Sequence, residues 1–314
     1  MALTTKHGYN MYEVSSMLQK AIRRSIKDDA IFAARELASF NKNLVWSRLK
    51  TCSAEDCLDF ATSAILKDNI DIEQATLTLV NARKNRDSDY FACNLLNSRD
   101  RIEIPFDTSN QFPTKNGHGI DDVKQSLEKA ITETPTDFKL IGYCANELMV
   151  RYRKNLWRVL MPLANIFPQL AVEVEVLRDV DMEQVGSKNE SSIFVAKAIM
   201  DILKTRIFGK EFFADVIIPE DEPIAVNFNR RIPDYVFDCH TAKGKYLGRT
   251  KKHFVKTEQE SLRPLTKCLF DECSWDRYFY LEANGFYNSA KLTPRPPKDV
   301  MKQIEDGIVE QTLF

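Results

Sequence analysis

The feature that most constrains this fold is a helical period that begins near the start of the chain. Apolar side chains recur at steps of three and four residues, at Val14, Met17, Leu18, Ala21 and Ile22. This spacing places them on one stripe of an amphipathic helix. Similar stripes follow after short loops, and short loops between helices favour antiparallel packing of neighbours. We therefore expect a mainly α-helical chain.

Further helices are predicted along most of the remaining sequence. They fall near residues 28–38, 44–52, 73–84, 87–97 and 120–133, over 121–178 with breaks at prolines, over 187–207, and in a short amphipathic tail at 298–314. Ser53, followed three residues later by Asp56, resembles a capping box and predicts that a separate helix opens there. The β-branched pieces between residues 208 and 231 predict an extended arm or a small hairpin.

The sequence also indicates how the chain is divided. Residues 99–118 contain Pro, Gly and several Asn, Asp and Ser residues, which is typical of a linker or a long loop. We predict a helical region over 8–98, this linker, and a second mostly helical region over 119–314.

Composition excludes several classes of protein. The 44 basic and 45 acidic residues leave a net charge of −1, so attraction to a polyanion must come from local patches. The seven cysteines are scattered and form no CxxC pair, which suits reduced thiols better than disulfides or a zinc ribbon. The beginning of the sequence lacks an apolar signal region, and the most apolar run contains charges, so we expect a cytoplasmic protein without a membrane segment.

Motifs of common enzymes are absent from the sequence. There is no GxxxxGK[ST] loop, GxGxxG fingerprint, GxSxG elbow or HExxH helix. We expect no enzymatic activity and no cofactor. One open alternative is a metal-dependent nucleic-acid enzyme that uses Asp234, Asp238, His240 and His253. Cys239 adjoins His240, but adjacent side chains in a helix or strand point apart, so a catalytic pair is not expected.

Two segments combine cations with aromatic side chains, and phosphate recognition needs cations while single strands add stacking on aromatic rings. The first segment is "RYRKNLWR" at residues 151–158. The second is residues 230–256, where Gly244 and Gly248 would let the backbone approach a ligand closely or adopt a positive φ. The predicted nucleic-acid-binding residues are Arg151, Arg153, Lys154, Arg158, Arg230, Arg231, Lys243, Lys245, Tyr246, Arg249, Lys251, Lys252, His253 and Lys256.

The stretch "VSSMLQKAIRRSIKDDAIFAARELASF" with "WSRLKTCSAED" resembles the helical C-terminal region of the MgsA/RarA family, clamp-loader-related AAA+ proteins of replication forks. The matching residues are Leu18, Lys20, Ile22, Arg23, Ser25, Asp28, Ala30, Ile31, Phe32, Arg48, Leu49, Glu55 and Asp56. The segment "DCHTAKGKYLGR" followed by "HF" is similar to a pattern of stand-alone relatives of that module. "AEDCL" departs from the family because it lacks a Gly in the turn.

The resemblance implies a multi-helix bundle like a clamp-loader collar, with a small irregular or β-containing insertion and without the family's ATPase domain. It also implies a homo-oligomer that acts with a replication or transcription protein in a bacterium or its virus. Combined with the basic segments, it predicts a non-catalytic accessory protein of DNA replication, repair or transcription. We expect it to bind nucleic acid, with DNA favoured and single strands included. The open alternative is an oligomeric scaffold whose cations contact acidic proteins.

Overall fold

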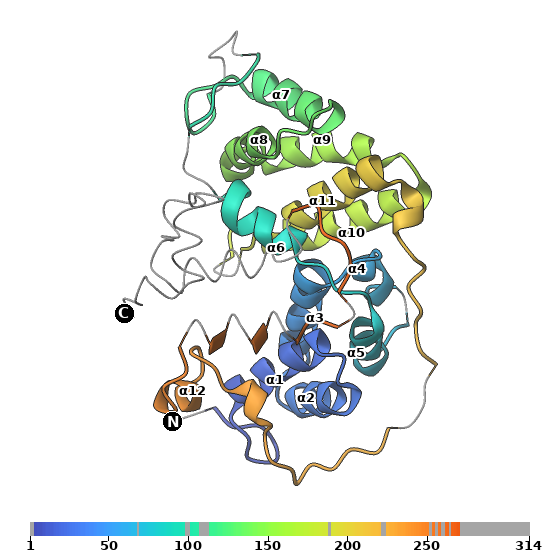
Figure 1. The fold of residues 1–314 in the computed structure, drawn as a ribbon, viewed down its shortest axis with the longest axis vertical. Coiled ribbons are helices and arrows are strands. Elements are labelled where there is room, and N and C mark those ends of the chain that lie inside the picture. The colour runs from blue at the N-terminus through green and yellow to red at the C-terminus, as the bar shows by residue number, and fades with distance from the viewer. Residues whose placement is uncertain are drawn as a thin grey trace, which may run out of the picture. The chain divides into compact units, whose positions relative to one another are not determined.

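The computed structural model describes residues 3–67, 69–97, 101–106, 113–187, 190–220, 224–250, 253–254, 257–258, 261–263 and 265–270. Within these residues the structure is helical and contains isolated bridges but no strand, which confirms the mainly α fold class (Figure 1). None of the described helices is long and apolar enough to cross a bilayer. The predicted tail helix at 298–314 lies outside the described residues, as does part of the 99–118 segment.

The chain forms two units, and the first is built from two separated parts of the sequence. It comprises residues up to Arg86 together with the described residues from Phe213 onward. Its helices are α1 (Met11–Arg23), α2 (Lys27–Phe40), α3 (Lys42–Asp56), α4 (Ala61–Ile65), α5 (Ile72–Asn81) and α12 (Ala242–Tyr246).

The core of the first unit lies between α1, α2, α3 and α5. Val14, Met17 and Leu18 of α1 are fully buried there, as the apolar period predicts. The later segment 224–237 packs side chains such as Phe228 against the same core, and the Tyr9 hydroxyl donates to the Phe228 carbonyl at 2.6 Å. The second part of the sequence therefore completes a core that the first part begins.

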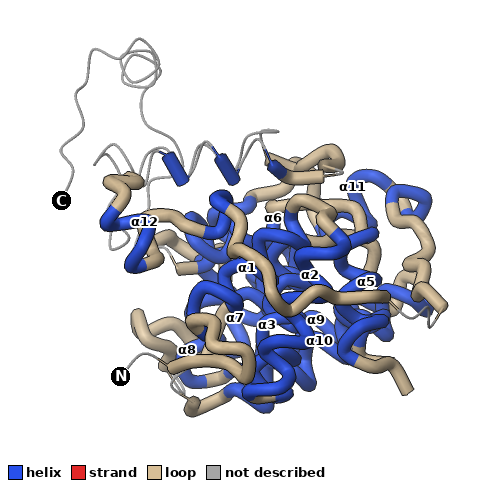
Figure 2. The backbone as a smooth tube through the Cα atoms, turned by 90° about the horizontal axis from the view of Figure 1, so that it is seen from below, coloured by secondary structure: helices blue, strands red, loops and turns tan. Residues whose placement is uncertain are grey.

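The second unit is continuous in sequence, from Asp87 to Phe212 in the described part. A backbone trace coloured by secondary structure shows its helices and their connecting loops (Figure 2). The helices are α6 (Asp87–Phe91), a π-helical turn (Ala92–Leu96), α7 (Ile120–Thr132), α8 (Phe138–Arg151), α9 (Arg153–Ala164), α10 (Pro168–Gln184) and α11 (Ile193–Phe208).

One local prediction is wrong, and another is confirmed in one of its two forms. Ser53 does not open a helix, because α3 continues through it to Asp56 and the Ser53 hydroxyl donates to the Lys50 carbonyl at 2.8 Å. Asp56 instead pairs with Arg23 and Arg86 inside the unit. The described part of 208–231 contains a short 3₁₀ turn (Lys210–Phe212) followed by extended chain, which fits the extended arm rather than the hairpin.

Candidate nucleic-acid interface

A compact turn at residues 238–241 positions the basic helix α12. The Thr241 hydroxyl donates to the Asp238 carbonyl at 3.0 Å and accepts from the Gly244 amide at 3.0 Å, so it caps the helix. The Asp238 carboxylate accepts from the amide of His240 at 2.7 Å. Threonine and aspartate favour such turns and caps because their short side chains bond nearby backbone groups.

The two glycines of this segment have roles inside the fold. A β-carbon on Gly244 would overlap the carbonyl group of Asp238, so only glycine allows α12 to pack on the turn. Gly248 ends the helix with a φ of +69°, and its amide donates to the Lys245 carbonyl at 3.0 Å. The positive φ that the sequence interpretation allowed is found at Gly248, whereas Gly244 approaches the backbone of Asp238 within the fold.

Helix α12 presents exposed cations and an aromatic ring. Tyr246 is 90% exposed and Leu247 is 49% exposed. Lys243 and Lys245 are exposed as well, and the Lys243 ammonium lies 3.9 Å from the centre of the Phe237 ring. This short helix thus combines the two kinds of side chain that contact single strands, namely cations and an accessible ring.

Other cations of the second basic segment stabilise the unit itself. Arg230 pairs with Asp29 and lies over the Phe32 ring at 5.1 Å. Arg249 pairs with Asp234 and donates to the Phe237 carbonyl at 2.6 Å.

Five further predicted residues are either exposed or outside the described part of the chain. Arg231 and His253 are exposed. Lys251, Lys252 and Lys256 lie outside the described residues.

The first basic segment does not form a single helical face. Arg151 is the last residue of α8, and Tyr152 is a non-helical residue that separates α8 from α9. Arg153 is buried and donates to Asp181 at 2.7 Å, which gives it a structural role. The two remaining cations, Lys154 and Arg158, are exposed on α9.

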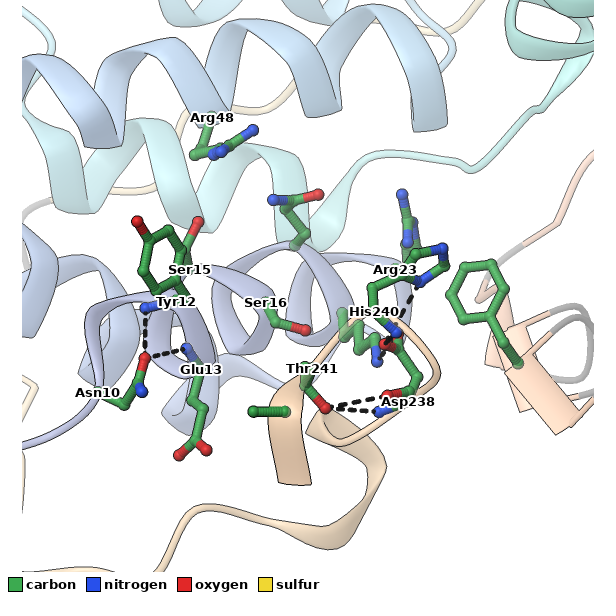
Figure 3. Close-up of a pocket in the computed structure, with 14 residues that line it drawn as sticks. Asn10, Tyr12, Glu13, Ser15, Ser16, Arg23, Arg48, Asp238, His240 and Thr241 are labelled. Carbon is green, nitrogen blue, oxygen red and sulfur yellow. Dashed lines mark hydrogen bonds and ion pairs between the residues drawn. The ribbon is translucent and has the colours of Figure 1, made fainter. Parts of the chain in front are cut away.

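A cleft of about 520 Å³ lies in the first unit, where α1 and α3 face the turn that precedes α12 (Figure 3). Arg48 of α3 reaches it, and its Nε is shielded from solvent without a hydrogen bond to any described group. The lining residues are Asn10, Tyr12, Glu13, Ser15, Ser16, Gln19, Lys20, Arg23, Arg48, Asp238, His240, Thr241, Ala242 and Phe254.

One wall of the cleft is an ionic network. The Lys20 ammonium lies 2.5 Å from the Asp238 carboxylate and donates to the Val236 carbonyl at 2.9 Å. Burial lowers the pKa of Lys20, and the charges of Glu258 and Asp238 offset this only in part. Burial alone would raise the pKa of Asp238, but hydrogen bonds from His240 and the charge of Lys20 hold it well below its usual range.

His240 adds a charge at the mouth of this cleft. Its Nδ1 lies 3.3 Å from the Asp238 carboxylate, and its side chain is 60% exposed. The hydrogen bond to Asp238 and the neighbouring Cys239 raise the pKa of His240 to about 9. The imidazole is therefore positively charged at neutral pH.

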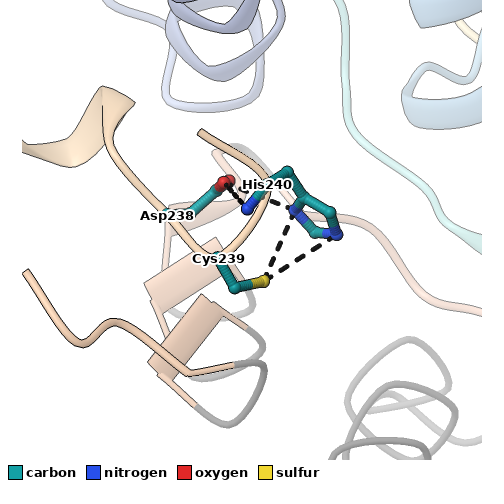
Figure 4. Close-up of side chains that lie close together, drawn as sticks. All are labelled: Asp238, Cys239 and His240. Atoms are coloured by element: carbon teal, nitrogen blue, oxygen red, sulfur yellow. Dashed lines mark hydrogen bonds and ion pairs between the residues drawn. The ribbon is translucent and has the colours of Figure 1, made fainter. Parts of the chain in front are cut away.

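Asp238, Cys239 and His240 lie close enough to be considered as metal ligands (Figure 4). The Cys239 Sγ is 3.5 Å from Nδ1 and 3.8 Å from Nε2 of His240, so the expectation that these side chains point apart is wrong. The segment is a turn rather than a helix or strand, which brings adjacent side chains together.

This trio nevertheless lacks the arrangement of a formed metal site. The sulfur is almost equally far from both ring nitrogens, whereas a metal is bound along the lone pair of one nitrogen. Asp238 is already paired with Lys20. Of the four residues in the earlier metal hypothesis, Asp234 pairs with Arg249 instead, and in the described part no group of three ligands includes Asp234 or His253.

Sequence reasoning missed the cleft because its walls come from distant parts of the chain. Tyr12 and Gln19 are on α1, Arg48 is on α3, and the turn begins at Asp238, 190 residues after Arg48. One signal was available in the sequence, which places the charged residues Lys20 and Arg23 beside the apolar stripe of α1. In the structure both side chains are buried. Buried charges require partners, so their presence indicates a polar network.

Comparison with protein-family models, curated proteins and solved structures gives no match. The resemblance to the helical region of the MgsA/RarA family therefore stays a prediction.

Proposed function

We propose that this chain is a non-catalytic nucleic-acid-binding protein whose first unit contacts the phosphates of a strand through α12. The observation that carries the proposal is the exposure of Lys243, Lys245 and Tyr246 on one short, capped helix. Cations on a folded scaffold attract phosphates, and an accessible tyrosine can stack on an unpaired base. Single-stranded DNA is the favoured ligand, and a role beside replication, repair or transcription proteins follows from the family resemblance.

The structure narrows the set of residues on which the proposal rests. Arg230, Arg249 and Arg153 support the fold through ion pairs, so we assign them no direct contact with a strand. Arg231 and His253 are exposed in the same unit as α12 and remain candidate contacts. Lys154 and Arg158 belong to the second unit and form a separate candidate contact.

Fluorescence anisotropy with a labelled single-stranded oligonucleotide tests this proposal. A variant with Lys243, Lys245 and Tyr246 replaced by Ala should bind at least about tenfold more weakly, because it loses two phosphate contacts and one stacking contact. The matched control replaces Lys42 and Lys67, which are exposed in the same unit but do not belong to α12 or line the cleft.

The control variant should bind like the parent protein. Equal loss in both variants would mean that α12 has no special part in binding. No binding by the parent protein at low salt would exclude the proposed function and favour the scaffold alternative, in which the cations contact acidic proteins.

A further inference from the structure

The cleft between α1, α3 and turn 238–241 contains a cation, Arg48, whose Nε is left unpaired by the described residues. Lys20 is paired with Asp238, and Arg23 donates from Nε to both oxygens of Asp56 at 3.0 Å. Arg48 differs from them, because its shielded Nε has no hydrogen-bond partner among the described residues. Leaving a shielded guanidinium donor unpaired is costly, so such a group is suited to a ligand that supplies an acceptor.

We propose that this cleft binds the phosphate group of one nucleotide, with Arg48 as its main charge partner. Arginine suits this task because its planar fork of donors matches two phosphate oxygens at once. The Ser15 hydroxyl and the Gln19 amide line the same cleft and can donate to the remaining oxygens. The inference rests on the proposed function, because the nucleotide is taken to be part of the bound strand.

The size and lining of the cleft fit this ligand class. A volume of about 520 Å³ falls within the range of small-molecule sites and is large enough for a mononucleotide. Tyr12 also lines the cleft and is 64% exposed, so its ring is accessible for stacking on a base. Figure 3 shows Tyr12 and Ser15 on α1 and Arg48 on the neighbouring helix α3.

The charges around the cleft include one that opposes the ligand. His240 adds a positive charge at the mouth, while the Asp238 carboxylate is balanced by Lys20 and His240. Glu13 is the remaining lining acid, and its carboxylate repels a phosphate. This arrangement makes opposite predictions for two substitutions: removing the Arg48 charge should weaken binding, and removing the Glu13 charge should strengthen it.

Isothermal titration calorimetry of the full chain at low salt tests the assignment with thymidine monophosphate, inorganic phosphate and thymidine. The parent protein should bind the monophosphate, bind inorganic phosphate more weakly, and not bind thymidine detectably. Arg48→Gln should lose about tenfold or more in affinity for the monophosphate. Lys42→Gln, which removes a charge from the same helix outside the cleft, should have no effect.

Glu13→Gln separates a local charge effect from a folding defect, because it should bind thymidine monophosphate about threefold more tightly, and a misfolded protein cannot gain affinity. Unchanged affinity in Arg48→Gln, or thymidine binding as strong as that of the monophosphate, would overturn the phosphate assignment. Arg48-dependent binding of the monophosphate without any oligonucleotide binding would keep the cleft as a nucleotide site and contradict the proposed function instead.

Discussion

Asp56 illustrates how strongly one side chain can stabilise the first unit. It is fully buried and pairs with Arg23 and Arg86. Burial alone would raise the pKa of Asp56, but the two guanidinium groups hold it below its usual value. The sequence analysis assigned this residue to a helix cap, because spacing shows a local pattern and cannot show two arginine partners distant in sequence.

Asp56→Asn should therefore be strongly destabilising. The change removes the fully buried carboxylate that Arg23 and Arg86 share and leaves Glu55 as their common partner. Breaking a buried pair in this way costs about 3–5 kcal/mol. Urea denaturation followed by circular dichroism measures the loss. Asp121→Asn, whose side chain is 93% exposed beside Lys124, serves as the control and should change stability by less than about 0.5 kcal/mol. Similar small effects for both variants would contradict the buried network.

His240 gives a prediction about pH. Its pKa of about 9 in the folded protein exceeds the usual value, so its contribution to stability is complete below about pH 6.5 and is lost as the pH rises through 9. The groups that face the ring are Asp238, Cys239 and Phe254, with Lys20 bound to Asp238.

Nuclear magnetic resonance titration of the His240 ring should show a midpoint near 9, and Asp238→Asn should lower that midpoint. His253→Gln removes an exposed imidazole of the same segment and should leave the titration unchanged. A midpoint near the ordinary value of about 6.5 in the parent protein would contradict the contact between His240 and Asp238.

At the scale of elements, the helices that carry a long apolar period could be predicted from the sequence. The stripe on α1 is such a case, and its apolar residues are fully buried. The short helix α12 could not be predicted in this way, because five residues contain too little of a period. Its conformation depends on a cap at Thr241 and on close packing of Gly244 against Asp238, and an apolar period shows neither contact.

The two glycines of this segment should respond differently to substitution. Gly244→Ala would force a side chain into the backbone of Asp238 and should cost about 1–3 kcal/mol, together with loss of oligonucleotide binding. A β-carbon at Gly248 meets no neighbouring atom, so Gly248→Ala should lower stability only through its positive φ, by about 1 kcal/mol. Thermal denaturation of both variants checks that Gly244→Ala is the more destabilised, and fluorescence anisotropy measures their oligonucleotide binding. A Gly244→Ala protein as stable and active as the parent would mean that α12 does not pack on the turn.

At the scale of the whole molecule, the sequence did not show which segments share a core. The linker expected at 99–118 lies within the second unit, and the structure divides the chain between Arg86 and Asp87. Helical periods identify buried faces, but they do not specify which face meets which. Segment 224–237 packs against the core of the first unit, and the turn that follows it lies beside α1. This packing between distant parts of the sequence forms the cleft.

The central claim is that α12 neutralises phosphates of a nucleic-acid strand, and the salt dependence of binding tests it most directly. For a single-stranded oligonucleotide, the logarithm of the affinity should fall linearly with the logarithm of the salt concentration, with a slope of about −0.7 for each neutralised phosphate. Replacing Lys243 and Lys245 by Ala should make that slope shallower by about 1.4. Replacing Lys42 and Lys67 should leave it unchanged. An affinity that does not depend on salt, or a slope that the α12 substitutions do not alter, would contradict the account.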